Sequence, residues 1–297
     1  MSVRITKKVY FRGNDNLTGY VFLAPALFVL IAVLLVPVIF NIIISLYDWS
    51  LVRDSQIFVG LRNYKEAFSD QTTVSSMWIT FVFTTISVGS ELILGFSLAM
   101  ILNSRIPGVK LFRLLCLLPF MVSQVVAALA WRFLYHTEFG LLNYFLSRLG
   151  FGAQLWLGSD LALASVIILE VWQNTPFVTI ILLAGLQTIS PELQEAARMD
   201  GAGFWRELKD ITIPLLKPQI FIALLFRTVF VMRVFTPVWV LTGGGPADST
   251  LVLSINIYRT AFRYLSLGRS ASLSCILFMI ALIVSIIYIR FVKQEYA

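Results

Sequence analysis

Five charged residues lie inside long apolar stretches of the sequence, where an ionised side chain carries a high free-energy cost. They are Glu91, Arg132, Glu170, Arg227 and Arg233. Charges in such places usually face a cavity or a pathway for substrates or ions. The structural alternative is an ion pair between helices or a charge that reaches the edge of the apolar layer. We favour the structural role for Arg132, near the end of its stretch, and leave a hydrogen-bonded structural acid open for Glu91.

The richest group of polar and aromatic side chains is the segment EVWQNTPF, residues 170–177. Pro176 lacks an N–H and presses on the carbonyl four residues earlier, which predicts an interrupted helix with free backbone acceptors. An indole can stack on the apolar face of a sugar ring, and side-chain amides can bond to its hydroxyls. The candidate substrate-binding residues are therefore Trp172, Gln173, Asn174 and Phe177. Packing alone is the alternative explanation for this Trp and Pro.

A second candidate group comes from helical spacing near residue 230. At about 100° per residue, one helix face carries four residues. These are Arg227, Phe230, Val231 and Val234. Arg233 lies about 120° from Arg227 on that helix, so we expect only one of the two guanidinium groups to line a cavity. Arg227 would suit a carboxylate, sulfonate or phosphate through paired donors. The alternative is a neutral ligand, with Arg227 paired to Glu170.

The composition shows what kind of chain must position these residues. Of its 297 residues, 58% are apolar and 13% charged, and the mean hydropathy is +0.85. A soluble domain carries about 25% charged residues. The two cysteines lie in apolar runs, so neither a disulfide framework nor a metal cluster is expected. The sequence therefore predicts an integral membrane protein, and it excludes a disordered chain and an ordinary cytosolic enzyme.

Six segments are long and apolar enough to cross a bilayer as helices, each needing about 20 residues. They are residues 17–46, 77–103, 111–135, 160–189, 219–241 and 268–292. No tract between them resembles a soluble domain. We therefore expect an all-α protein with six transmembrane helices, forming one domain over residues 1–297.

The loops differ in basic residues, which sets orientation in a membrane. One set of loops holds 13 Lys and Arg residues and the opposite set holds 7. This predicts that both termini, the N-terminal segment 1–16 and the loop 190–218 are cytoplasmic. The net charge of +7 then reflects this bias and implies no nucleic-acid partner.

The loop 190–218 is predicted to form two short helices. Ser190 can cap the first, Pro191 suits its first turn, and Gly201 can end it. A second amphipathic stretch, residues 204–211, is expected to stop before Pro214.

The spacing within this loop resembles a known family. Glu195-Ala196-Ala197, then Gly201, then Ile211-Thr212-Ile213-Pro214 resembles the EAA loop of permease subunits of binding-protein-dependent ABC importers. Further stretches resemble the first permease subunit of the maltose-type sugar importers. These are Ala24-Pro25-Ala26, Gly60-Leu61-Arg62-Asn63-Tyr64, Trp131-Arg132-Phe133, Gly140-Leu141-Leu142-Asn143, Ala184-Gly185-Leu186-Gln187 and Leu241-Thr242-Gly243-Gly244-Gly245-Pro246. The chain departs from the family at Arg269, where an aromatic residue is usual.

The resemblance implies the type I permease fold of ABC importers, in the cytoplasmic (inner) membrane of a bacterium. It implies that Glu195, Ala196, Ala197 and Gly201 form a coupling helix that docks on a cytoplasmic ATPase subunit. It further implies a second permease subunit, two ATPase subunits that bind ATP and Mg²⁺, an external solute-binding protein and a sugar substrate. Spans four and five would line the sugar passage, which favours the Arg227 face.

The sequence itself also indicates that another subunit supplies the energy for transport. None of the seven lysines follows a glycine, so the chain has no phosphate-cradling lysine of the P-loop type. We expect no cofactor, catalytic residue or metal site in this chain. The alternative is a secondary transporter or channel driven by an ion gradient, with the buried charges as a relay. It gives no reason for the spacing at residues 195–214.

Overall fold

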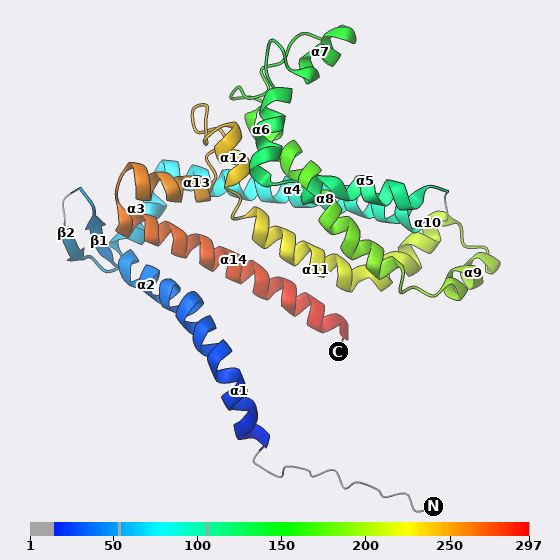
Figure 1. Cartoon of the computed structure of the whole chain (residues 1–297), viewed down its shortest axis with the longest axis horizontal. Coiled ribbons are helices and arrows are strands. Elements are labelled where there is room, and N and C mark those ends of the chain that lie inside the picture. The colour runs from blue at the N-terminus through cyan, green and yellow to red at the C-terminus, as the bar shows by residue number, and fades with distance from the viewer. Residues whose placement is uncertain (1–14, 53–54, 105–106, 297) are drawn as a thin grey trace, which may run out of the picture.

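The computed structural model describes residues 15–52, 55–104 and 107–296, so the predicted N-terminal segment 1–16 lies almost entirely outside the described residues. Long helices form one bundle, with a small hairpin at one end and a short helix-turn segment at the other (Figure 1). The helices are α1 (Asp15–Leu30), α2 (Val36–Ser45), α3 (Arg62–Ser69), α4 (Gln71–Asn103), α5 (Val109–Met121), α6 (Gln124–Leu134), α7 (Leu141–Arg148), α8 (Ala162–Leu186), α9 (Pro191–Met199), α10 (Phe204–Glu207), α11 (Ile213–Val231), α12 (Thr236–Leu241), α13 (Leu253–Tyr258) and α14 (Leu267–Tyr296). Strands β1 (Tyr47–Ser50) and β2 (Ser55–Phe58) pair antiparallel.

Five helical segments of the described chain are long and apolar enough to cross a membrane. They are Phe22–Ser45, Gln71–Asn103, Ala162–Leu186, Phe204–Val231 and Leu267–Phe291. The pair α5 and α6 makes a sixth span if the two are counted together. The prediction of an all-α fold with six spans is confirmed, with one span present as a bent pair.

The third predicted span, 111–135, is not one straight helix. The axes of α5 and α6 differ by 97°, and the break lies at Val122 and Ser123, whose backbone is extended. A break at membrane depth needs partners for its free backbone groups. The carbonyl of Val122 has one, because the side-chain amide of Gln173 on α8 donates to it at 2.9 Å.

The fifth predicted span, 219–241, is wrong at both ends. Helical structure runs without interruption from Phe204 to Val231, through Pro214, where a stop was expected. A π-helical turn over residues 208–212 widens the helix just before this proline, which occupies the first turn of α11 and needs no N–H donor there. Pro37 in the first span follows another π-helical turn in the same way. At the other end α11 stops at Val231, and residues 232–235 form a non-helical turn before α12.

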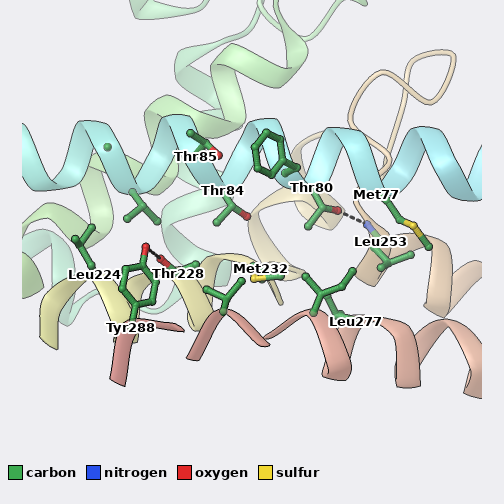
Figure 2. A pocket seen from close by; sticks show the side chains of 15 residues that line it. Met77, Thr80, Thr84, Thr85, Leu224, Thr228, Met232, Leu253, Leu277 and Tyr288 are labelled. Atoms are coloured by element: carbon green, nitrogen blue, oxygen red, sulfur yellow. Dashed lines mark hydrogen bonds between the residues drawn. The ribbon is translucent and has the colours of Figure 1, made fainter. Parts of the chain in front are cut away.

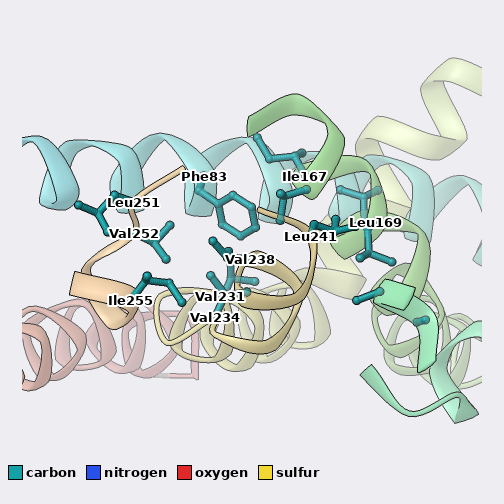
Figure 3. Close-up of a cluster of buried hydrophobic side chains, with 14 of the residues drawn as sticks. Phe83, Ile167, Leu169, Val231, Val234, Val238, Leu241, Leu251, Val252 and Ile255 are labelled. Atoms are coloured by element: carbon teal, nitrogen blue, oxygen red, sulfur yellow. The ribbon is translucent and has the colours of Figure 1, made fainter. Parts of the chain in front are cut away.

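Helices α4 and α8 form the centre of the bundle. Gly95 of α4 lies against Val178 of α8, and a Cβ atom on this glycine would come within 2.8 Å of the valine side chain. A small residue here lets the two backbones approach closely, as is common between membrane helices. Further along, a cluster of buried aliphatic side chains and Phe83 joins α4 and α8 to α11, α12 and the segment before α13 (Figure 3). The central helices are thus packed into one core.

The first span packs on the bundle mainly through α2, its C-terminal part. Its α1 part extends away from the other helices (Figure 1), and most of its described side chains are exposed. In α2, the amide of Asn41 donates to the carbonyl of Ala271 and to the thiol of Cys275 on α14, both at 3.3 Å.

An ion pair joins the ends of α4 and α14 beside the hairpin. Arg269, the departure from the family pattern, places a guanidinium nitrogen 2.8 Å from a carboxylate oxygen of Asp70. Asp70 also caps α4 by accepting bonds from the backbone N–H and hydroxyl of Thr73. Burial alone would raise the pKa of Asp70, but the bonds from Thr73 and the nearby Arg269 hold it below its ordinary value. The predicted start of the last span at residue 268 agrees with α14.

We expect Arg269→Met to lower stability by about 0.2–1 kcal/mol at neutral pH, the range of partly exposed ion pairs. Because the pKa of Asp70 is lowered by folding, this contribution is present above its unfolded pKa and is lost as the pH falls through its folded pKa. Thermal unfolding of the purified protein at neutral and acidic pH measures both effects. Arg62→Met, which breaks the more exposed pair with Glu66, is the control. A destabilisation by Arg269→Met that persists at acidic pH would contradict the ion-pair explanation.

Candidate functional site

A buried cluster of three charged side chains joins the three central helices. Arg227 on α11 donates from Nε to one oxygen of Glu91 on α4 at 2.6 Å, and from Nη2 to the other at 2.7 Å. The same Nη2 donates to Glu170 on α8 at 2.8 Å. None of the three side chains is more than 5% exposed. Two carboxyl groups neutralise the single guanidinium, so Arg227 has no unpaired positive charge for a ligand. The structure therefore agrees with the alternative in which Arg227 is paired to Glu170.

Helical spacing on α8 explains how this cluster meets the surface of a cavity. Glu170, Asn174 and Phe177 stand at positions i, i+4 and i+7 and therefore share one face. The amide of Asn174 donates to the Glu170 carboxylate at 2.9 Å and to its backbone carbonyl at 3.1 Å. The amide thereby fixes the orientation of the carboxylate that Arg227 binds.

A cavity of about 430 Å³ opens beside this cluster, between α5, α6, α8 and the end of α11. This volume lies within the roughly 300–1,000 Å³ of small-molecule sites. Its lining residues are Phe120, Gln124, Glu170, Asn174, Phe177, Arg227, Phe230, Arg233, Val234, Phe235 and Thr236. Five predicted site residues thus lie together in one cavity wall: Asn174, Phe177, Arg227, Phe230 and Val234.

The expectation that only one of Arg227 and Arg233 lines the cavity is wrong. The 120° separation assumes that the helix continues, but α11 ends at Val231 and Arg233 lies in the turn that follows. Its guanidinium carbon lies 5.7 Å from the centre of the Phe230 ring, and its Nε donates to the carbonyl of Val229. Arg233 is exposed, and it has no carboxylate partner among the described residues.

Three predicted site residues do not reach this cavity. The ring of Trp172 packs against that of Trp131, with 5.6 Å between the ring centres. The amide of Gln173 donates to the carbonyl of Val122, at the break between α5 and α6. Val231 is fully buried in the aliphatic cluster. Trp172 and Gln173 are two and one residues from Asn174, so the helix turns them to other faces. The interruption predicted at Pro176 is also wrong, since α8 is continuous from Ala162 to Leu186.

The hydroxyls of threonines on either side of Pro176 bond to backbone carbonyls of α8. The hydroxyl of Thr175 donates to the carbonyl of Val171 at 2.6 Å, and Thr179 donates to Thr175 at 2.9 Å. Neither bond reaches the carbonyl of Trp172, which Pro176 leaves without its usual donor, but α8 stays helical through this position. The non-helical backbone instead occurs at residues 122–123 and 232–235, beside the cavity.

Sequence reasoning missed four lining residues. Phe120 and Gln124 flank the break after α5, and Phe235 and Thr236 flank the turn before α12. Pro119 and Pro237, one near each break, are the sequence signals that could have located these residues.

A larger cavity of about 510 Å³ lies between α4, α11 and α14 (Figure 2). Its lining is mainly aliphatic, and its polar groups are threonines and Tyr288. The hydroxyl of Thr80 accepts a hydrogen bond from the backbone N–H of Leu253 at 2.8 Å. The hydroxyl oxygens of Thr228 and Tyr288 lie 3.4 Å apart. This cavity holds no charged or amide side chain among the described residues that line it, so it offers a sugar much less hydrogen bonding than the smaller one.

The predicted coupling residues lie on α9 and the turn after it, at one end of the bundle (Figure 1). Gly201 ends the helix with φ +79°, and the N–H of Ala202 bonds to the carbonyl of Ala197 at 2.9 Å. This is a Schellman motif, which explains the glycine. Glu195 and Ala196 are exposed and Ala197 is half-buried. Exposed apolar side chains surround them, with Met199 at 89% and Trp205 at 77%.

Apolar helices around a cavity lined by charged, amide and aromatic side chains define a multi-span membrane transport protein. The chain belongs to the family of inner membrane components of binding-protein-dependent transport systems, whose model matches residues 67–293. It is therefore a membrane component of such a system.

Individual relatives cover almost the whole chain. The trehalose/maltose transport system permease protein MalF of Thermococcus litoralis is 38% identical over 294 residues, covering 98% of each chain. The sulfoquinovosyl glycerol transport system permease protein SmoG of Agrobacterium fabrum is 34% identical, covering 95% of this chain and 92% of the relative. A chain of a bacterial alginate ABC transporter, solved with an alginate pentasaccharide-bound periplasmic protein, has a TM-score of 0.80 at 21% identity over 92% of this chain and 93% of that one. The last likeness confirms the predicted ABC importer permease fold.

We expect Arg227→Met to destabilise the folded protein by about 3–5 kcal/mol, because it leaves two carboxyl groups buried without their cation. Adding Glu91→Gln and Glu170→Gln should restore most of the loss. Thermal unfolding of the purified protein measures both changes. Arg233→Met, which removes an exposed arginine of the same segment, is the matched control and should stay within about 0.5 kcal/mol. Equal effects of Arg227→Met and Arg233→Met would contradict a structural ion cluster.

Proposed function

We propose that the chain is a permease subunit of an ATP-driven importer for a sugar or sugar derivative. The cavity beside the buried charge cluster carries this proposal. Aromatic rings (Phe177, Phe230) supply flat apolar faces, while Asn174 and Gln124 supply amides for hydroxyl groups. The names of MalF and SmoG support a sugar or glycoside as the substrate.

The partners follow from the division of labour within such an importer. This chain has no lysine of the P-loop type, so two separate ATPase subunits would bind ATP and Mg²⁺, and a second permease subunit would complete the passage. An external solute-binding protein would deliver the sugar, as the family description and the alginate complex support. Alternating access would follow, with ATP binding turning the cavity outward and hydrolysis resetting it inward.

The segment from α9 to α10 is the proposed contact with an ATPase subunit. Exposed apolar residues at a helix end, such as Met199 and Trp205, indicate a surface that another protein covers. Ala196 and Ala197 let that protein approach the backbone closely. From Phe204 the helix continues directly into α11, which carries Arg227, so movement of this segment would reach the charge cluster.

This segment and both termini would lie in the cytoplasm, and the protein would span a bacterial inner membrane. The excess of basic residues in the loops on this side supports that orientation. The whole chain, residues 1–297, would act as one permease domain with its coupling loop at 190–218.

The ion-gradient alternative assigns the buried charges to a proton or ion relay. The three charges instead contact one another directly and join α4, α8 and α11. The family match is to a binding-protein-dependent system, which favours the ATP-driven importer.

Uptake by the reconstituted system tests the proposal. Proteoliposomes with both permease subunits, both ATPase subunits and the solute-binding protein should accumulate sugar only when ATP is inside. Accumulation by this chain alone under an ion gradient would contradict the proposal and favour the secondary transporter.

We expect Ala196→Trp to reduce ATP-coupled uptake at least tenfold, because an indole would hold the docking surfaces apart. Membrane insertion and pairing with the second permease should be unchanged. Uptake and copurification of the ATPase subunits measure the effect. Ala153→Trp, at an exposed alanine in the opposite loop, controls for expression and insertion. Full ATP-coupled uptake by Ala196→Trp would contradict the assignment of the coupling helix.

A further inference from the structure

Arg233 is an exposed arginine that lies beside the middle of a candidate membrane-spanning helix. Besides the substrate cavity, it lines a second hollow against residues 274–285 of α14. The candidate span of α14 runs from Leu267 to Phe291, so Arg233 lies beside its middle. An exposed arginine near the middle of a bilayer is costly unless it faces water or an opposite charge.

The surroundings of Arg233 supply no opposite charge from the part of the chain that the structure describes. Its Nε bonds to the carbonyl of Val229, and the ring of Phe230 lies under its guanidinium. Glu170 is the acidic residue of the same cavity wall, and its ion pair is with Arg227. The planar donor face of Arg233 is therefore free for a ligand.

The rest of the cavity limits what that ligand is. Asn174 and Gln124 offer amides for hydroxyls, and Phe177 and Phe230 offer ring faces. A guanidinium binds carboxylate or sulfonate through two parallel hydrogen bonds. We propose that Arg233 is the substrate-selecting cation of this permease and that the imported sugar bears an acidic group, a carboxylate or a sulfonate.

This inference rests on the proposed function and names its substrate class. It also replaces Arg227 as the anion-binding residue, because Arg227 serves the buried cluster. A neutral sugar would leave the guanidinium of Arg233 without a partner during passage.

A charge-selective labelling experiment tests the site with small reagents of known charge in place of the sugar. Thr236→Cys places a thiol in the cavity wall, three residues from Arg233. The complete importer in nanodiscs is treated with the anionic 2-sulfonatoethyl or the cationic 2-trimethylammonioethyl methanethiosulfonate. Each reagent forms a mixed disulfide with the thiol and releases methanesulfinate. The importer without Thr236→Cys gives the background from Cys116 and Cys275.

We expect the ratio of anionic to cationic labelling rates to fall at least tenfold when Arg233→Met is added, and to fall less with Arg233→Lys, which keeps the charge but loses the paired donors. Arg148→Met, which removes an exposed arginine on α7 outside the cavity, should leave the ratio unchanged. An unchanged ratio in Arg233→Met overturns the proposal, as does absence of reaction with either reagent, which would show that the site is not wet.

Assembly and uptake separate the remaining possibilities. If Arg233 pairs with a carboxylate of the second permease, Arg233→Met will reduce copurification of the two permeases without changing the ratio, and the anion site is overturned. If the importer takes up sugar with ATP but Arg233→Met leaves the ratio of labelling rates unchanged, the anion site alone is contradicted. Absence of ATP-driven sugar uptake with a ratio that depends on Arg233 contradicts the proposed function instead.

Discussion

The buried contact of Arg227 with Glu91 and Glu170 is the interaction on which the arrangement of the central helices depends. Each residue comes from a different helix, and bonds of 2.6–2.8 Å join all three. Removing Arg227 would leave two buried carboxyl groups without their cation, so α4, α8 and α11 must keep their mutual register. Close packing at Gly95 and the aliphatic cluster around Phe83 maintain the same register from either side.

With these helices held together, the non-helical backbone beside the cavity lies where helices break. The turn at residues 122–123 and the turn at residues 232–235 flank the cavity, and side chains bond to backbone carbonyls of both turns, Gln173 to Val122 and Ser254 to Val234. Breaks of this kind are tolerated in a membrane only against protein or water. The charge cluster and the broken helices therefore have different roles: the first joins the helices, and the second shapes part of the cavity wall.

The two ends of the molecule serve different contacts. At the hairpin end, the ion pair of Arg269 and Asp70 joins the start of α14 to the start of α4. At the other end, α9 carries small and exposed apolar residues and leads through α10 into a single helix that reaches Arg227. Helical structure is continuous from Phe204 to Arg227, so the coupling proposed for α9 has a physical route to the charge cluster once the short turn after α9 is passed.

The sequence by itself determined the class of the molecule, because hydropathy and spacing are local properties. Six apolar segments, the loop spacing at 195–214 and the glycine that ends α9 could all be read residue by residue. The sequence could not show which charged residues pair, because Glu91 and Arg227 are 136 residues apart in the chain. Likewise, helical spacing predicted a straight helix through Arg233, and the proline at position 176 predicted a break in α8. The tertiary structure decided otherwise: α8 is buried among the other helices and stays helical through Pro176, whereas α11 ends at Val231, which packs into the core.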